Sequence, residues 1–219
     1  MEEKNVKPQG LNENVQQETD IVALAKANKK RIIAVVVVVL AVVAGALVWN
    51  AVSKSNAAKA DEAVGLADAA VNDSIALELY KNAATLGHKS GNRAKVEVAI
   101  RLYQQKDYQG ALQNLEDASI DDQVVAAGVQ SLRGDCYVNL QNYDMALKAF
   151  DEAIGSAEGN PAIVPLFLIK KANVYRAQGD YAAEYNAYKT IVDEYPQYTT
   201  QSAFDVNKYM ERAKAAAGK

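Results

Sequence analysis

Small and apolar residues recur at helical spacing along residues 130–154. Gly134 and Tyr137 lie three positions apart, and a second series follows a polar break at residues 141–142; its members are Tyr143, Ala146, Phe150 and Ala153. Steps of three and four residues place side chains on one face of an α-helix. Asn142 stands where its side-chain oxygen can cap the second helix. The stretch therefore predicts two antiparallel helices joined by a tight turn, with small residues where the helices approach each other closely.

The same pattern recurs along the chain from origins at Val64, Ala99, Gly134 and Ala172, and the last interval is slightly longer than the two before it. The positions at offsets +9, +12, +16 and +19 from these origins are Asp73, Ala76, Tyr80 and Ala83; Tyr108, Ala111, Leu115 and Ala118; Tyr143, Ala146, Phe150 and Ala153; and Tyr181, Glu184, Tyr188 and Ile191. The residues just before each set are Asn72, Asp107, Asn142 and Asp180. Because Asn and Asp are favourable N-caps, each second helix is predicted to begin at the same point of the pattern.

A repeating unit of helix, turn and helix with a period of about 34 residues is the signature of tetratricopeptide repeats. The chain resembles this family over roughly residues 57–198, with Pro196 closing the last repeat. The resemblance implies an all-α solenoid of antiparallel helix pairs. The first repeat is degenerate, and Glu184 and Ile191 replace small residues in the last repeat, so the packing of the last pair departs most from the pattern.

Glycine and proline mark the ends of the expected helix pairs. Gly87 and Gly91 are predicted to end the first pair. A longer join over residues 155–165 accounts for the longer last interval, and Pro165 suits the first turn of the helix that follows. Segment 200–216 carries apolar residues on one side, namely Phe204, Val206, Tyr209 and Met210. We expect this segment to form a C-terminal capping helix within a repeat domain that spans residues 53–219.

Residues 32–49 form an uninterrupted run of uncharged residues. As a helix this run is about 27 Å long, which matches the hydrocarbon core of a bilayer once Ala51 and Val52 are added. A cleaved signal peptide would have a charged lead-in of a few residues and an apolar core of about 7 to 15, whereas here the run is longer and begins only at Ile32. We therefore predict a retained transmembrane helix, with its juxtamembrane lead-in, over residues 20–52. Residues 1–19 are polar and predict a disordered cytoplasmic tail.

The charges that flank this run predict its orientation. Four basic residues crowd its N-terminal end: Lys26, Lys29, Lys30 and Arg31. The other end offers only Lys54 and Lys59 before acidic residues follow. By the positive-inside rule the N-terminus stays in the cytoplasm and the repeat domain is exported, with Trp49 at the outer interface. This arrangement predicts a single-pass membrane protein with an exported repeat domain.

Charge and composition argue against several classes of function. The net charge of the chain is −3. Residues 1–31 carry a net charge of +1, so the remaining residues carry −4. A mildly acidic repeat domain does not favour nucleic-acid binding, which needs a basic face. His88 is the only histidine and is predicted to lie in a turn, so neither a Ser-His-Asp triad nor a two-histidine metal site can be built. The lone Cys136 excludes an internal disulfide and is expected to be an inert packed thiol. We expect no enzyme activity, no cofactor and no metal.

Tetratricopeptide stacks present a concave surface lined by the first helix of each repeat, on which a peptide or a partner helix can lie. Nine residues point away from the packed small residues and are predicted to form this partner-binding groove: Val96, Ile100, Tyr103, Ser131, Asp135, Val138, Ile169, Asn173 and Arg176. The lining is mixed apolar and polar. It does not match the basic, asparagine-bearing clamp with which chaperone-binding members of the family hold acidic C-termini, because Asp135 occupies the middle. The alternative is that these are ordinary solvated helix faces.

A cytoplasmic tail, one membrane helix and an exported repeat domain are similar in architecture to the bacterial ancillary subunit of the Sec translocon. The stretches GDCYVNLQNYDMALKAFDEAI and VPLFLIKKANVYRAQGDYAAEYNAYKTIVDEYP also resemble anchored repeat proteins of the Bacteroidetes type. The resemblance implies a location in the bacterial inner membrane with the repeat domain in the periplasm. It also implies protein partners at the Sec channel, periplasmic chaperones or exported clients.

Two alternative functions stay open, as does the oligomeric state. The first is an envelope scaffold that self-associates and has no link to secretion. The second is an organelle import receptor, which would need the opposite orientation. An outer-membrane assembly lipoprotein would need a cysteine just after its signal sequence, and the chain has none there.

Overall fold

The computed structural model describes residues 27–218 of the 219-residue chain, and the regular secondary structure of these residues is entirely α-helical. It divides into two units, one that ends at Ser55 and one that begins at Asn56. Lys26, the predicted tail over residues 1–19 and the first part of the predicted juxtamembrane lead-in lie outside the described residues. The all-α prediction is confirmed.

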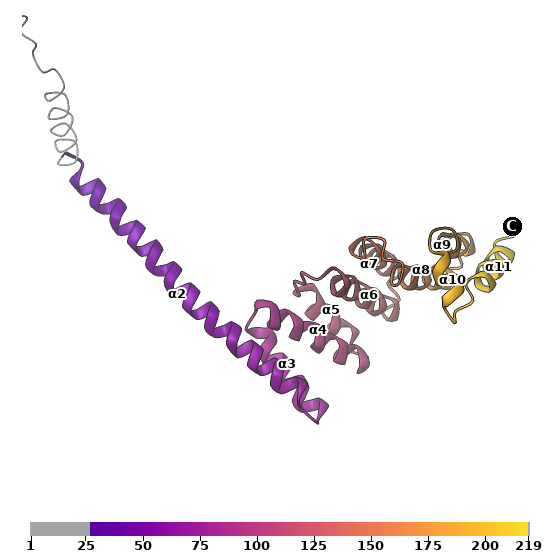
Figure 1. Ribbon diagram of the computed structural model, residues 1–219, viewed down its shortest axis with the longest axis horizontal. Coiled ribbons are helices and arrows are strands. Elements are labelled where there is room, and N and C mark those ends of the chain that lie inside the picture. The colour runs from indigo at the N-terminus through magenta and orange to yellow at the C-terminus, as the bar shows by residue number, and fades with distance from the viewer. Residues whose placement is uncertain (1–26, 219) are drawn as a thin grey trace, which may run out of the picture. The chain divides into compact units, whose positions relative to one another are not determined.

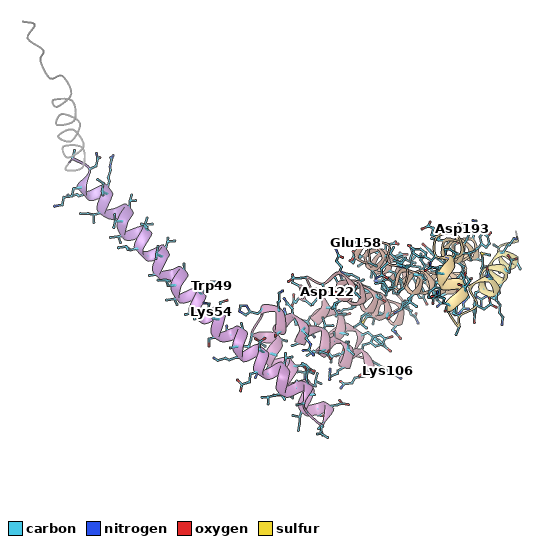
Figure 2. All side chains as sticks on the ribbon, in the orientation of Figure 1. Trp49, Lys54, Lys106, Asp122, Glu158 and Asp193 are labelled. Atoms are coloured by element: carbon cyan, nitrogen blue, oxygen red, sulfur yellow. The ribbon has the colours of Figure 1, made fainter. Side chains whose placement is uncertain are left out.

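The described part of the first unit is made up mainly of the apolar part of helix α2 (Lys29–Asp68), a helix of 40 residues. The predicted basic residues Lys29, Lys30 and Arg31 stand at its start. None of its most apolar 18-residue window is buried inside the structure, and Figure 2 shows Trp49 projecting from the helix, with 77% of its surface exposed. A helix of this length and composition near the N-terminus fits a membrane anchor or a signal sequence.

The second unit is a succession of helix pairs that follow one another along the chain (Figure 1). The end of α2 packs with α3 (Asp73–Thr85) in a common core; the next pairs are α4 (His88–Gln104) with α5 (Tyr108–Glu116), α6 (Gln123–Asn139) with α7 (Tyr143–Ser156), and α8 (Val164–Gln178) with α9 (Tyr181–Glu194). Two further helices close the unit: α10 (Pro196–Gln201) and α11 (Val206–Ala216). The predicted pairing of helices is confirmed.

All four predicted N-caps are present and hydrogen-bonded. The side-chain oxygens of Asn72, Asp107, Asn142 and Asp180 accept from the backbone N–H of Ser74 and Ile75, Gly110, Met145 and Ala183, respectively. Each bond satisfies an amide that the first turn of a helix leaves without a partner. The second helix of each pair therefore starts where the local sequence places it.

The repeated small and apolar positions form the core of the second unit. The four origins are buried, and so are the residues at offsets +12 and +16 in every pair, including Tyr80, Leu115, Phe150 and Tyr188. The predicted apolar side of the C-terminal segment packs on the last core cluster, with Val206 fully buried. The capping helix therefore covers the end of the last pair, as its pattern predicted.

The predicted helix end at Gly91 and the predicted start of the capping helix near residue 200 are wrong. Gly91 does not end the first pair but is buried in the first turn of α4, where a Cβ atom would lie 3.0 Å from the carbonyl oxygen of Ala83. The residue is small because two backbones approach each other there. Pro196 ends α9 but also starts α10, since proline fits the first turn of a helix. The capping helix accordingly begins at Val206 rather than near residue 200.

Three equivalent turns between the first and second helices use left-handed backbone conformations. Their residues are Lys106 with φ 66°, Gln141 with φ 60° and Gly179 with φ 78°. A side chain in this region costs about 1 kcal/mol. We expect Gly179→Gln to lower the free energy of unfolding by about that amount in urea unfolding followed by circular dichroism. The reverse change, Gln141→Gly, should not lower it, because glycine adopts the left-handed conformation without this cost. Equal losses in the two variants would contradict this account.

Candidate partner-binding face

The nine predicted residues lie on the three first helices α4, α6 and α8, which together we call the α4–α6–α8 face. Their exposure is uneven. Asn173 and Arg176 on α8 are exposed, and Ser131 on α6 is buried with 5% of its surface accessible. The other six residues are half-buried. Ser131 therefore offers almost no surface to a partner, and α8 offers the most.

A chain of polar contacts connects these three helices. The side-chain amide of Asn139 donates to the Tyr103 hydroxyl at 3.3 Å and to the backbone oxygen of Asp135 at 2.8 Å. The Asp135 carboxylate in turn forms an ion pair with the ammonium of Lys170. The structure thus brings together Tyr103 and Asp135 through Asn139, which the sequence pattern did not single out.

Asn139 and Lys170 could have been found from the repeat itself. Tyr103 and Asn139 are 36 residues apart, and Asp135 and Lys170 are 35 apart. These separations are close to one repeat, so a polar residue on one first helix meets a residue one repeat later. The sequence analysis used the period to align the core positions and did not apply it to polar residues.

Most charged groups on this face have a partner of opposite charge within the same domain. Burial raises the pKa of the Asp135 carboxyl, and the hydrogen bond and charge of Lys170 act in the opposite direction. Burial also raises the pKa of the Tyr103 hydroxyl, with a further contribution from the Asp135 charge. Neighbouring cations are paired as well, Arg101 with Glu97 at 2.8 Å and Arg133 with Glu152 at 3.6 Å. On α4 and α6 the face consequently presents paired charges and neutral hydrogen-bonding groups, whereas Arg176 on α8 adds an exposed positive charge.

The apolar members of the face belong partly to the core. Val96 and Tyr103 pack against the cluster around Leu112, Val138 against the cluster around Phe150, and Ile169 against the last cluster. Ile100 and Tyr103 stay half-exposed one turn apart on α4. The face therefore combines partly exposed apolar side chains with polar contacts between the helices.

Two clefts of the second unit lie away from these nine residues. One of about 340 Å³ is lined by α3, Lys95 of α4, α5 and Asp117, and Lys95 there donates to the backbone oxygen of Asp117 at 2.8 Å. The other, of about 450 Å³, is formed by the join between α7 and α8, the first turn of α8, α10 and Ser202. The sequence analysis predicted neither cleft.

The other residues that could act in catalysis or bind a metal are His88, Cys136 and the acidic side chains. His88 is not in the predicted turn but is the first residue of α4, with φ 62°. Within residues 27–218, no group of three or more His, Cys, Asp or Glu side chains is placed to hold a metal ion.

Cys136 lies on α6 with no exposed surface, and burial raises the pKa of its thiol to about 11. Because the thiolate is the reactive form, we expect less than about 1% of the thiol to be ionised at pH 8 in the folded chain. Ellman's reagent should therefore react with the chain at least about tenfold faster in 8 M urea than in buffer. A control variant with a cysteine at exposed Lys148 should add one rapidly reacting thiol without denaturant. Equal rates for Cys136 with and without urea would show that the residue is accessible and reactive.

Comparison with known proteins does not assign the chain to a family. No protein-family model matches it, and no curated protein matches it significantly. The structure itself shows a protein of stacked helix pairs with one long apolar N-terminal helix.

Proposed function

We propose that this protein is a membrane-anchored tetratricopeptide adaptor without catalytic activity. Its α4–α6–α8 face holds protein partners on the periplasmic side of the bacterial inner membrane, at the Sec translocon with its chaperones and exported clients. The observation that carries the proposal is the presence, in one chain, of a helix suited to a bilayer and three successive first helices that side-chain contacts connect to one another.

Helix α2 supports a membrane anchor because the rest of the chain does not bury its apolar part. An apolar window of 18 residues, none of which is buried inside the structure, would be exposed to water in a soluble protein, and lipid removes that cost. Basic residues stand at the start of the helix, and Trp49 stands near the end of the apolar run. This asymmetry supports an N-terminus on the cytoplasmic side.

Partner binding is supported by the composition of the face. Asn173 and Arg176 are exposed, Tyr103 and Ile100 are half-exposed, and Asp135 is neutralised by Lys170. Apolar surface with fixed hydrogen-bonding groups suits an extended polypeptide, which needs both contact area and partners for its backbone.

Protease protection tests the topology. Protease added to intact spheroplasts should digest the repeat domain and leave the N-terminal segment intact, and lysis should expose both. A repeat domain that is protected in spheroplasts but digested after lysis would reverse the proposed orientation.

Photo-crosslinking in living cells tests the partner. A benzoylphenylalanine at position 173 should crosslink translocon subunits, periplasmic chaperones or exported chains, identified by mass spectrometry. The matched control is the same group at exposed Lys148 on α7, which should give few of these products. Recovery of cytosolic proteins alone would reject the proposal, and crosslinks only between copies of the chain would favour a self-associating scaffold.

A further inference from the structure

The 450 Å³ cleft is built by the two segments that interrupt the regular repeat. One wall comes from the join between α7 and α8, which lengthens the last repeat interval, and from the first turn of α8. The opposite wall comes from α10 and the residue that follows it. Neither wall includes any of the nine residues predicted for partner binding. The cleft therefore requires an explanation of its own.

The join that forms the first wall is held in one conformation. Glu158 and Gly159 adopt left-handed conformations with φ 46° and 75°, and the Asn160 side chain accepts from the backbone N–H of Ala162 at 2.9 Å. The backbone oxygen of Asn160 also accepts from Ile163 and Val164. Figure 2 shows Glu158 where the join leaves α7, and its carboxylate accepts from the side-chain amide of Gln123 on α6 at 2.7 Å. A wall fixed in this way does not have to be ordered when a ligand binds.

The lining has a clear chemical character. Its apolar members are Pro161, Ala162, Leu166 and Tyr198, and its polar members are Gln197, Gln201 and Ser202. Leu166 is 43% exposed, although it is a large apolar residue. Gln197 and Gln201 stand one helical turn apart on α10, and within residues 27–218 their side-chain amides make no hydrogen bond. None of the lining residues carries a charge.

We infer that this cleft binds an extended, uncharged stretch of another polypeptide that inserts one large apolar side chain between Leu166 and Tyr198. Gln197 and Gln201 donate to and accept from the backbone of that stretch, as strand-like ligands require. The absence of charge in the lining matches an uncharged ligand, because a charged side chain would lose hydration without gaining a partner. A volume of about 450 Å³ lies within the usual range for such pockets. A folded second copy does not fit this role, since a stable interface covers roughly 800 Å² of each partner.

Photo-affinity labelling of the full chain in lipid nanodiscs tests the inference. The probe is an acetylated and amidated heptapeptide, Gly-Ser-Gln-photoleucine-Gln-Ser-Gly, with labelled residues located by mass spectrometry. We expect saturable labelling within residues 161–166 and 197–202. The same peptide with leucine at the centre should compete, whereas peptides with glutamate or lysine at the centre should need at least tenfold higher concentrations.

Matched variants distinguish binding in the cleft from non-specific binding elsewhere on the chain. Leu166→Lys should reduce labelling at least tenfold, and Leu140→Lys, at a residue with 42% exposure in the turn before α7, should change it less than twofold. Circular dichroism would confirm that both variants keep their helix content. Labelling outside the cleft, equal competition by charged peptides, equal loss in both variants or no saturable labelling at 5 mM probe would each overturn the inference.

Discussion

Replacing Arg212 by alanine is expected to lower the free energy of unfolding by about 3 kcal/mol, because it leaves a buried carboxylate without its partner. Glu184 has no accessible surface, and one of its carboxylate oxygens accepts from the Arg212 guanidinium of the capping helix. Its other oxygen is buried and has no hydrogen-bond partner among the described residues. The expected loss lies at the lower end of the range for buried pairs, since the side chain of Arg212 is 43% exposed.

The repeat supplies the control for this experiment. The residues equivalent to Glu184 in the other three pairs are alanines, so Glu184→Ala gives the last pair the residue that the fold uses elsewhere. We expect the double variant Glu184→Ala with Arg212→Ala to be more stable than Arg212→Ala alone, because the uncompensated charge is gone. Lys214→Ala serves as a surface control. The Lys214 side chain is also 43% exposed, and loss of its contact with Glu211 at 3.8 Å should lower the free energy of unfolding by less than about 1 kcal/mol.

Urea unfolding at pH 7 would measure the four variants. Loss of the Arg212 side chain also removes a contact with the Tyr209 ring, whose centroid lies 4.8 Å from the guanidinium carbon. The comparison between the single and double variants separates the two effects, since the ring contact is missing in both. If the double variant is as unstable as Arg212→Ala, the buried charge is not what the capping helix stabilises.

The sequence predicted those features that depend on neighbours a few residues apart. The four N-caps and the buried face of each second helix follow from local spacing, and all of these caps formed. Glu184 stood out as a departure from the pattern, but its partner did not. Arg212 lies 28 residues away on a helix outside the repeat, so no periodicity connects the two.

The errors arose where two elements meet. Gly91 looks like a helix end, and only its distance to the backbone of α3 explains why a glycine is needed inside α4. The cleft beside α10 was missed for the same reason, because its two walls come from segments far apart in the sequence and both segments are irregular. For the α4–α6–α8 face, the sequence named the residues, and the structure added Asn139 and Lys170, which connect them.

Gly134→Ala is expected to destabilise the second unit by about 2 kcal/mol, the cost of forcing an extra methyl group into a filled core. A Cβ atom at this position would lie 2.3 Å from Cε1 of Phe150, so the fully buried ring would have to move. The control is Gly128→Ala in the same helix, where nothing lies within 4 Å of the new atom. That change should stabilise the chain by about 0.5 to 1 kcal/mol, because alanine favours the helix.

A second substitution tests whether the clash is the cause. The pair before this one has Ala99 at the origin and Leu115 at offset +16, where the third pair has Gly134 and Phe150. Phe150→Leu alone should cost about 1 to 2 kcal/mol by leaving a cavity beside Gly134. Combined with Gly134→Ala, the new methyl group occupies part of that space, so the double variant should be at least about 1 kcal/mol more stable than the sum of the single changes predicts. Strict additivity in urea unfolding would mean that the ring can move aside freely, and close approach at Gly134 would then not be what holds α6 against α7.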